Sequence, residues 1–388
     1  MSPSVIEAIS ETTQNIREKI APQSSDKTNN DGTKSQEAPN SEKLSPSAVA
    51  PSGTPQEQHR EPLKLSGTLD KFESFDVTPI IGREYVGVNL AEWIHAPSSD
   101  DLLRDLAITI SQRGVVFFRK QDDITNDLQK ELVQRLGELS GKPSTSKLHI
   151  HPVSNSGREH GGKDDEISIY DRNFEAKHRQ SAKEGWHSDI TFEPIPSDYA
   201  LLRLTELPKT GGDTLWASGY EVYDRISKPV QKFLETLTAT YAQPEFNKAA
   251  EKNGFKLYSA ERGAPENVGE KLEAVHPVVR TNPVTGWKSI FALGHHVSHI
   301  NELTTIESDA LLTWFLRLVV DNHDLQVRHR WENVNDLAIW DKQYHVATSD
   351  YINLGLGERA WPTGCERPYL DPESTGRREG LEKLQSAE

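Results

Sequence analysis

The sequence predicts a mainly β protein with helices packed outside an antiparallel barrel or jelly roll. Two observations carry this prediction. From Tyr199 onward, short apolar runs typical of strands recur with turn-forming residues between them. Helical patterns also occur, but they do not alternate with the strands at the regular spacing of parallel βαβ units. Many strands without that spacing favour an antiparallel architecture.

The elements follow from local patterns. Ser99 to Asp101 caps a helix that ends at Gly114, and the apolar strand 115–118 comes directly afterwards. A second helix is expected over 127–139. Further strands are expected over 199–204, 213–218, 276–281, 287–293 and 336–340, with another helix over 308–321.

One folded domain is expected. All 29 aromatic residues of the 388-residue chain lie at Phe72 or later, so the first 71 positions hold nothing large enough to anchor a core. Residues 21–62 are rich in Ser, Pro, Gln, Asn and charge, which is typical of disorder. We therefore predict a disordered extension over 1–65, a folded domain over 66–372 and a tail over 373–388.

Composition excludes several classes of protein. The formal net charge of −15 disfavours a nucleic acid partner. No run approaches 18 apolar residues, which excludes a membrane span, and the start of the chain lacks targeting features, so a cytoplasmic location is expected. The single cysteine, Cys365, permits neither an internal disulfide nor a Cys-based zinc cluster. A bound metal would therefore use histidines and carboxylates, while the oligomeric state stays open.

The motif GWHSDITF places His187 and Asp189 two residues apart. In a strand both would project from one face and hold a cation between them. Such pairs also occur as solvated or core-bonded residues, so a distant third ligand is needed. Two imidazoles and one carboxylate form the facial triad of non-haem Fe(II) oxygenases.

His345, in IWDKQYHVATSDY, is the candidate third ligand because it follows the strand 336–340. Arg359 lies 14 residues further on, and its planar guanidinium suits a bidentate grip on a carboxylate. A surface ion pair is the alternative interpretation of this arginine.

Four motifs in order carry a resemblance: WHSDITF, LPKTGGDTLWASGYEVYD, HPVVRTNPVTGWKSIF and LQVRHRWENVNDLAIWD. Together they are similar to the taurine dioxygenase family (TauD/TfdA type) of Fe(II)- and 2-oxoglutarate-dependent dioxygenases, especially its fungal sulfonate dioxygenases. The resemblance covers about Asp76 to Pro372. It implies a double-stranded β-helix (jelly roll) and a dioxygenase catalytic domain over 66–372.

The resemblance also implies the site. His187, Asp189 and His345 would bind Fe(II), and Thr214 and Arg359 would hold the distal carboxylate of the cosubstrate 2-oxoglutarate.

His151, in KLHIHP, matches a histidine that contacts the anionic group of a small-molecule substrate, although the neighbouring His149 leaves open which of the two is structural. With O2, hydroxylation next to a sulfonate would release sulfite and an aldehyde. Iron binding is expected to weaken as pH falls, because ligand histidines must be neutral.

The sequence departs from the family pattern twice. Only three residues separate Asp341 from His345, fewer than in relatives. Relatives commonly carry a second, substrate-binding arginine four residues after the first, where this chain has Thr363, and the segment from Arg359 to Tyr369 is shorter. A loss of one charge-assisted contact, about 1.5–3 kcal/mol, would disfavour taurine without ending oxygenase chemistry.

Three alternatives remain at this stage. They are an oxygenase acting on a less charged metabolite, a degenerate member that binds without turnover, and a zinc hydrolase. The histidines in GHHVSH, at 295, 296 and 299, are interpreted as packing or pocket shape, and Arg328 to Arg330 as a basic strand face. The polar stretch around 149–184 suits a mobile lid.

Overall fold

The structure, a computed structural model, describes residues 59–153, 185–341 and 367–387, together with the backbone of strands 167–170, 345–349 and 357–360. The predicted disordered extension lies outside the described residues as far as residue 58, as does most of the predicted lid. Residues 59–65 are described, and the Leu63 N–H donates to the Val284 carbonyl over 2.8 Å.

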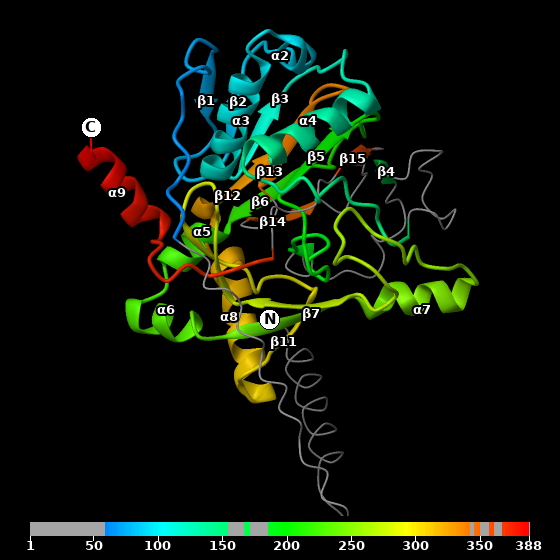
Figure 1. Ribbon diagram of the computed structural model, residues 1–388, viewed down its shortest axis with the longest axis vertical. Coiled ribbons are helices and arrows are strands. Elements are labelled where there is room, and N and C mark those ends of the chain that lie inside the picture. The colour runs from blue at the N-terminus through cyan, green and yellow to red at the C-terminus, as the bar shows by residue number, and fades with distance from the viewer. Residues whose placement is uncertain are drawn as a thin grey trace, which may run out of the picture. The chain divides into compact units, whose positions relative to one another are not determined.

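A seven-stranded sheet organises the domain (Figure 1). Neighbouring strands within this sheet are antiparallel, except for β2 and β3, which are parallel. The strand order is β1 (Ser74–Asp76), β2 (Arg83–Tyr85), β3 (Val115–Phe118), β13 (Leu337–Asp341), β5 (Tyr199–Leu204), β15 (Gly357–Ala360) and β4 (Ile167–Tyr170).

Helices cover one face of this sheet. Side chains alternate along a strand, so Val116 and Phe118 of β3 share a face with Leu201 of β5 and Ile339 of β13. These residues form a buried core with helices α2 (Leu90–His95), α3 (Ser99–Arg113) and α4 (Asn126–Leu139). Figure 1 shows the three helices grouped beside β3 and β13.

The opposite face packs against a second sheet of order β12 (Gln326–His329), β6 (Thr214–Ser218) and β14 (His345–Ser349). Phe117, Leu202 and Trp340 from the large sheet are buried with Trp216 of β6 and Val327 of β12. Two β-sheets therefore share one apolar layer, as in sandwich and jelly-roll proteins.

A further buried cluster lies around a third sheet, β11 (Val297–Ile300), β7 (Thr238–Ala242) and β8 (Glu273–Pro277). Helix α8 (Thr305–Val320) contributes Phe315 and Val319 to this cluster. The remaining elements are α5 (Gly219–Asp224), α6 (Lys228–Leu234), α7 (Pro244–Asn253), the hairpin β9 (Val279–Thr281) with β10 (Lys288–Ile290), the 3₁₀ helix η3 (His323–Leu325) and α9 (Arg377–Ala387).

The predicted elements with strong local patterns are present. Helix α3 ends where Gly114 adopts a positive φ of 77°, a conformation that glycine reaches without strain, and β3 follows at once. The prediction for 328–330 was wrong in part. Arg328 and Arg330 are exposed, but His329 is buried and stacks on Phe117 with ring centroids 4.0 Å apart.

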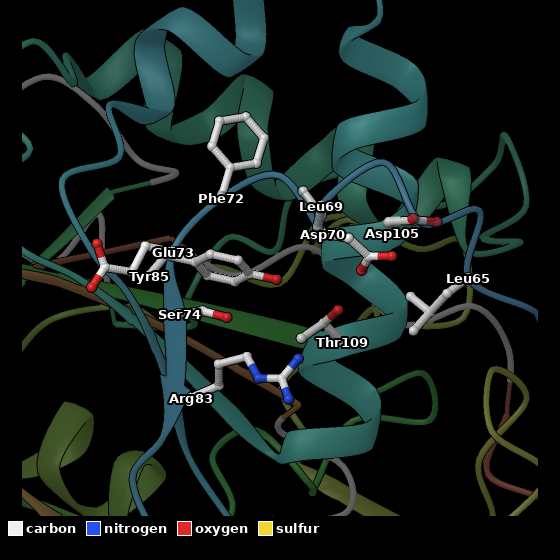
Figure 2. A pocket seen from close by; sticks show the side chains of 10 residues that line it. All are labelled: Leu65, Leu69, Asp70, Phe72, Glu73, Ser74, Arg83, Tyr85, Asp105 and Thr109. Atoms are coloured by element: carbon white, nitrogen blue, oxygen red, sulfur yellow. The ribbon is translucent and has the colours of Figure 1, made fainter. Parts of the chain in front are cut away.

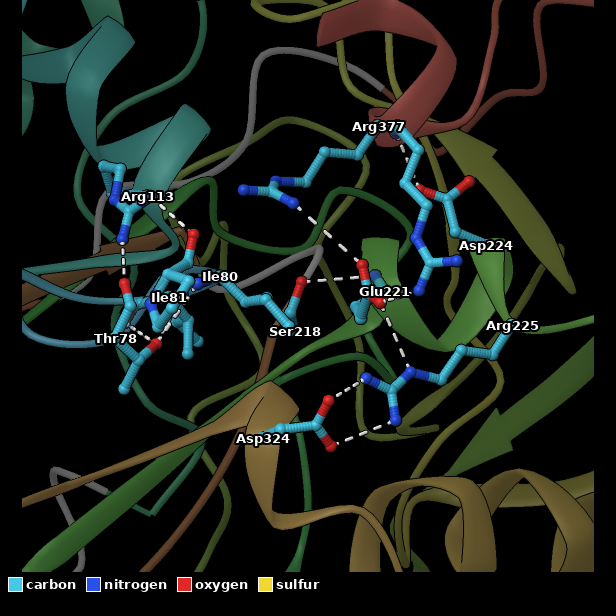
Figure 3. A network of polar contacts seen from close by, with 12 residues as sticks. Thr78, Ile80, Ile81, Arg113, Ser218, Glu221, Asp224, Arg225, Asp324 and Arg377 are labelled. Atoms are coloured by element: carbon cyan, nitrogen blue, oxygen red, sulfur yellow. Dashed lines mark hydrogen bonds and ion pairs between the residues drawn. The ribbon is translucent and has the colours of Figure 1, made fainter.

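The predicted tail contains helix α9, which binds α5 through charged groups (Figure 3). Glu221 is buried and pairs with Arg378 and, over 4.0 Å, with Arg377. Arg225 adds a contact of 3.3 Å to the same carboxylate. The backbone N–H of Glu221 donates to the Ser218 hydroxyl, which caps α5 at the end of β6. The ion pairs thus attach α9 to the end of a sheet strand.

We predict that Asp224→Asn stabilises the protein at about pH 8. Asp224 accepts the Arg378 backbone N–H over 2.9 Å, and burial raises the pKa of its carboxyl from 3.8 to about 6. The carboxyl therefore binds its proton more tightly in the folded protein than in the unfolded chain. The stabilisation that results is fully present below pH 3.8 and is lost as pH rises through about 6, so above that pH the ionised Asp224 lowers the free energy of unfolding.

The measurement is the melting temperature of both proteins across this pH range. The gain should shrink toward pH 4, where the wild-type carboxyl is largely protonated in the folded protein. Asp309→Asn, at an exposed position of α8, is the control. A gain that is equal at all pH values would contradict the prediction.

Candidate active site

His187 and Asp189 lie side by side, but the backbone between them is not a regular strand. His187 forms an isolated β-bridge with Gly294, and a turn begins at Asp189. Gly294 has φ +93°, and a Cβ built on it would lie 2.6 Å from the His187 Cα. Only glycine fits this contact, so Gly294 allows the backbone around residue 294 to lie directly against that of His187.

The polar contacts of His187 leave one ring nitrogen for a ligand. Its Nδ1 lies 2.7 Å from the Gly185 carbonyl oxygen, which can only accept, so Nδ1 carries a proton. Its Nε2 lies 2.7 Å from Asp189 Oδ1. With the ring proton on Nδ1, Nε2 and Asp189 Oδ1 would face each other with lone pairs. Either a second ring proton or a bound cation must therefore lie between them. A carbonyl on the far ring nitrogen is the usual support for a metal-binding histidine, so the pair fits a metal such as Fe(II).

The third predicted ligand, His345, is the first residue of β14, of which the structure describes only the backbone. Its Cα is paired with that of Ser218 in β6. Among the side chains that the structure describes, no three His, Cys, Asp or Glu residues lie close enough to hold a metal. The role of His345 therefore stays a prediction.

Thr214, the first residue of β6, is buried, and its Oγ1 accepts a hydrogen bond from Trp331 Nε1 over 3.1 Å. The Thr214 hydroxyl also has a proton of its own that it can donate to an acceptor. Arg359 of β15 is paired in register with Leu202, which belongs to the same apolar layer as Trp331. The side chain of Arg359 lies outside the described residues.

The structure separates the two histidines of KLHIHP. His149 is fully buried, and its Nε2 donates to Glu193 Oε1 over 3.0 Å. His151 is partly exposed, and its Nδ1 accepts the Val153 N–H over 3.3 Å, which makes Nε2 the hydrogen-donating nitrogen of the neutral ring. Its ring lies 5.2 Å from that of Phe246. His149 is thus held in the interior, whereas the role of His151 as a substrate contact stays a prediction.

Two further histidines lie beside the candidate metal pair. The ring of His295 is 4.9 Å from that of His187, and the ring of His296 is 6.2 Å from it. The sequence showed this cluster but not its position, because only the bridge through Gly294 brings it to His187. His295 is exposed, whereas His296 is buried.

A cavity of about 390 Å³ elsewhere in the domain is a poor functional candidate (Figure 2). It lies between β1, β2 and α3, and two of its charged groups, Arg83 and Asp105, already bind protein atoms. Arg83 Nε donates to Asp76 over 2.8 Å, and buried Asp105 accepts the Ser66 N–H over 2.9 Å. These contacts explain its polar lining without a ligand.

Comparisons with known proteins place the chain in a family. Residues 73–343 match the sequence model of "Taurine catabolism dioxygenase TauD, TfdA family". The chain is 53% identical over 339 residues to the alpha-ketoglutarate-dependent dioxygenase btcD of Neocamarosporium betae, covering 82% of this chain and 98% of that protein. It is 32% identical over 283 residues to the alpha-ketoglutarate-dependent sulfonate dioxygenase of Saccharomyces cerevisiae, covering 71% and 62%.

A crystal structure of a putative alpha-ketoglutarate-dependent taurine dioxygenase from Burkholderia xenovorans has a similar fold, with a TM-score of 0.58 at 22% identity, covering 78% of this chain and 93% of that one. The chain therefore belongs to the TauD/TfdA family. It is an Fe(II)- and 2-oxoglutarate-dependent dioxygenase that uses O2 and acts on small molecules. No helix in the described part of the chain is long and apolar enough to cross a membrane.

We predict that Gly294→Ala weakens metal binding by about tenfold or more, because the new methyl group would displace His187. Binding of Fe(II) or Co(II) under anaerobic conditions is the measurement. Gly141→Ala is a matched control, because Gly141 also has a positive φ, +106°, but its Cβ would meet nothing within 4 Å. Equal losses of metal affinity in both variants would contradict the prediction.

Proposed function

We propose that the enzyme hydroxylates a small organosulfonate, releasing sulfite and an aldehyde, with succinate and CO2 as coproducts. The observation that carries the oxygenase site is the contact between His187 Nε2 and Asp189 Oδ1, with His187 Nδ1 committed to a carbonyl. In this proposal His187, Asp189 and His345 bind Fe(II), which with 2-oxoglutarate and O2 supplies the oxidising chemistry. The two packed sheets form a double-stranded β-helix (jelly roll) around it.

Thr214 and Arg359 hold the distal carboxylate of 2-oxoglutarate. Trp331 donates to the Thr214 oxygen, which orients the hydroxyl so that its proton points to an acceptor. The buried layer around Trp216 and Leu202 excludes water, which strengthens an arginine–carboxylate bond. Strand register supports the assignment, since Arg359 is paired with Leu202 in this layer.

His151 contacts the anionic group of the substrate. The Val153 N–H donates to Nδ1, so the proton of the neutral ring is on Nε2, the nitrogen that would donate to a sulfonate oxygen. His151 is only partly buried, so it can reach a ligand that enters from solvent. Gly185 has a comparable role at the metal, because its carbonyl fixes the ring orientation of His187.

A non-sulfonate metabolite is the second candidate substrate. The relative at 53% identity carries a name without a substrate, whereas the named sulfonate dioxygenase is 32% identical. Thr363 also occupies the position at which relatives commonly carry the second arginine. The identity of residue 363 favours a less strongly anionic group than that of taurine.

We predict that Thr214→Val raises the KM for 2-oxoglutarate by about tenfold, since a hydrogen bond to a charged group is lost. Arg359→Met should have a larger effect on the same KM, and neither change should abolish Fe(II) binding. Succinate formation and the visible charge-transfer band of the anaerobic Fe(II)–2-oxoglutarate complex are the measurements. Arg330→Met, at an exposed position of the second sheet region, is the control. An unchanged KM in both site variants would remove the assignment.

We also predict that a panel of organosulfonates releases sulfite in step with succinate. Acceleration of succinate formation only by compounds without a sulfonate would show that the second candidate is correct. Thr363→Arg is the matched gain-of-function test, because it restores the cation that relatives carry. Improved taurine turnover in this variant would locate the specificity at residue 363, and no gain would assign it to the shortened segment as a whole.

A further inference from the structure

Glu193 is the centre of a charged cluster that has almost no contact with solvent. Its side chain and that of Arg262 are each 1% exposed, and that of His149 is 0% exposed. Arg262 donates through Nε to Oε1 and through Nη2 to Oε2 over 2.8 Å, while His149 Nε2 donates to Oε1 over 3.0 Å. Burial alone would raise the pKa of Glu193, but these hydrogen bonds outweigh it and lower the pKa.

The cluster joins the two halves of the proposed site. Glu193 follows Asp189 by four residues, and His149 precedes His151 by two. The bond between Glu193 and His149 therefore connects the metal-binding segment directly to the segment that carries the proposed substrate contact.

Arg262 belongs to a third segment, residues 258–263, which hydrogen-bonds to the chain on both sides of His151. The Lys147 N–H donates to the Gly263 carbonyl over 2.6 Å, and the Tyr258 N–H donates to the Pro152 carbonyl over 2.8 Å. Because Arg262 lies between Tyr258 and Gly263, its bidentate bond to Glu193 ties both backbone contacts to the metal-binding segment.

The backbone of Glu193 is fixed as well. His276 is buried, and its Nε2 lies 2.9 Å from the Thr191 carbonyl and 3.1 Å from the Glu193 carbonyl. Burial lowers the pKa of His276 to about 3, so the ring is a neutral donor to these oxygens. Hydrogen bonds thus hold Glu193 through both its backbone carbonyl and its side-chain carboxylate.

Stability alone is a weak explanation for such a cluster. Desolvating two charges offsets much of their attraction, and apolar replacements of buried ion pairs are often as stable. A hydrogen-bonded ion pair does, however, fix distances and angles more closely than apolar packing.

We propose that Glu193 is a positioning residue that fixes the His151 segment relative to the His187–Asp189 pair, and so sets where a substrate lies against the metal. The geometric part of this inference stands on the contacts alone, and its consequence for the reaction rests on the proposed function. Hydroxylation requires the target carbon at a narrow range of distances from the oxidant, so a small displacement lowers coupled turnover steeply.

The test compares the wild type with the double variant Glu193→Gln/Arg262→Met. The single variant Glu193→Gln would leave the Arg262 charge buried without its partner, whereas the double variant removes both charges and should fold. The glutamine also keeps an acceptor for His149. The matched control is Glu235→Gln/Lys288→Met, which removes another largely buried ion pair, with 3.1 Å between Lys288 Nζ and Glu235 Oε1.

The first measurement is amide hydrogen exchange, which needs no substrate. In the double variant we expect exchange at the Lys147 and Tyr258 amides to rise by about tenfold or more, while the amides of β13 keep their wild-type rates. The control variant should leave all of these rates unchanged. Unaltered exchange at Lys147 and Tyr258, or an equal rise throughout the domain, would overturn the proposal.

The second measurement is the ratio of succinate formed with substrate to succinate formed without it, using the panel compound that stimulates wild type most. We expect this ratio to fall by about tenfold in the double variant while the KM for 2-oxoglutarate stays within about twofold. An unchanged ratio would overturn the functional consequence. Absence of the charge-transfer band in wild type would instead contradict the proposed function, and the exchange result would still decide whether Glu193 fixes the His151 segment.

Discussion

Buried carboxylates hold both ends of strand β13, and the arrangement of the sheets depends on that strand. At its start, Asp336 accepts the backbone N–H groups of Lys120, Glu332 and Asn333 and a guanidinium hydrogen of Arg119. These bonds outweigh burial and lower the pKa of Asp336. At its end, Asp341 accepts from Asn282 over 2.7 Å. Between them the strand pairs with β3 and β5 and leads into the segment of the proposed distal ligand.

Burial divides the histidines of this protein into two groups with different chemistry. His276 and His329 are buried, and desolvation lowers the pKa of each to about 3, so they act as neutral packing and hydrogen-bonding groups. His151 and His187 are partly exposed, and they carry the proposed substrate and metal contacts. Burial therefore keeps His276 and His329 uncharged at neutral pH, whereas the candidate site histidines keep some contact with solvent.

The sequence was sufficient where a local pattern and the tertiary environment agree. The apolar periodicity of α3, its glycine stop and the apolar run of β3 each predict one element, and the structure contains them at the expected residues. The sequence predicted only a tail over 373–388. The structure contains helix α9 there, which docks through Arg377 and Arg378 on a buried glutamate, a partner more than 150 residues away that no local pattern reveals.

The sequence by itself determined the family, the type of chemistry and the identity of the candidate residues, because metal-binding and carboxylate-binding groups must be of particular types in a particular order. The tertiary structure alone decided which of two neighbouring histidines is buried. His149 and His151 occupy alternate positions of the same motif, yet the first is buried and hydrogen-bonded to Glu193, whereas the second is partly exposed. Burial depends on contacts between distant segments, and those contacts exist only after the chain has folded.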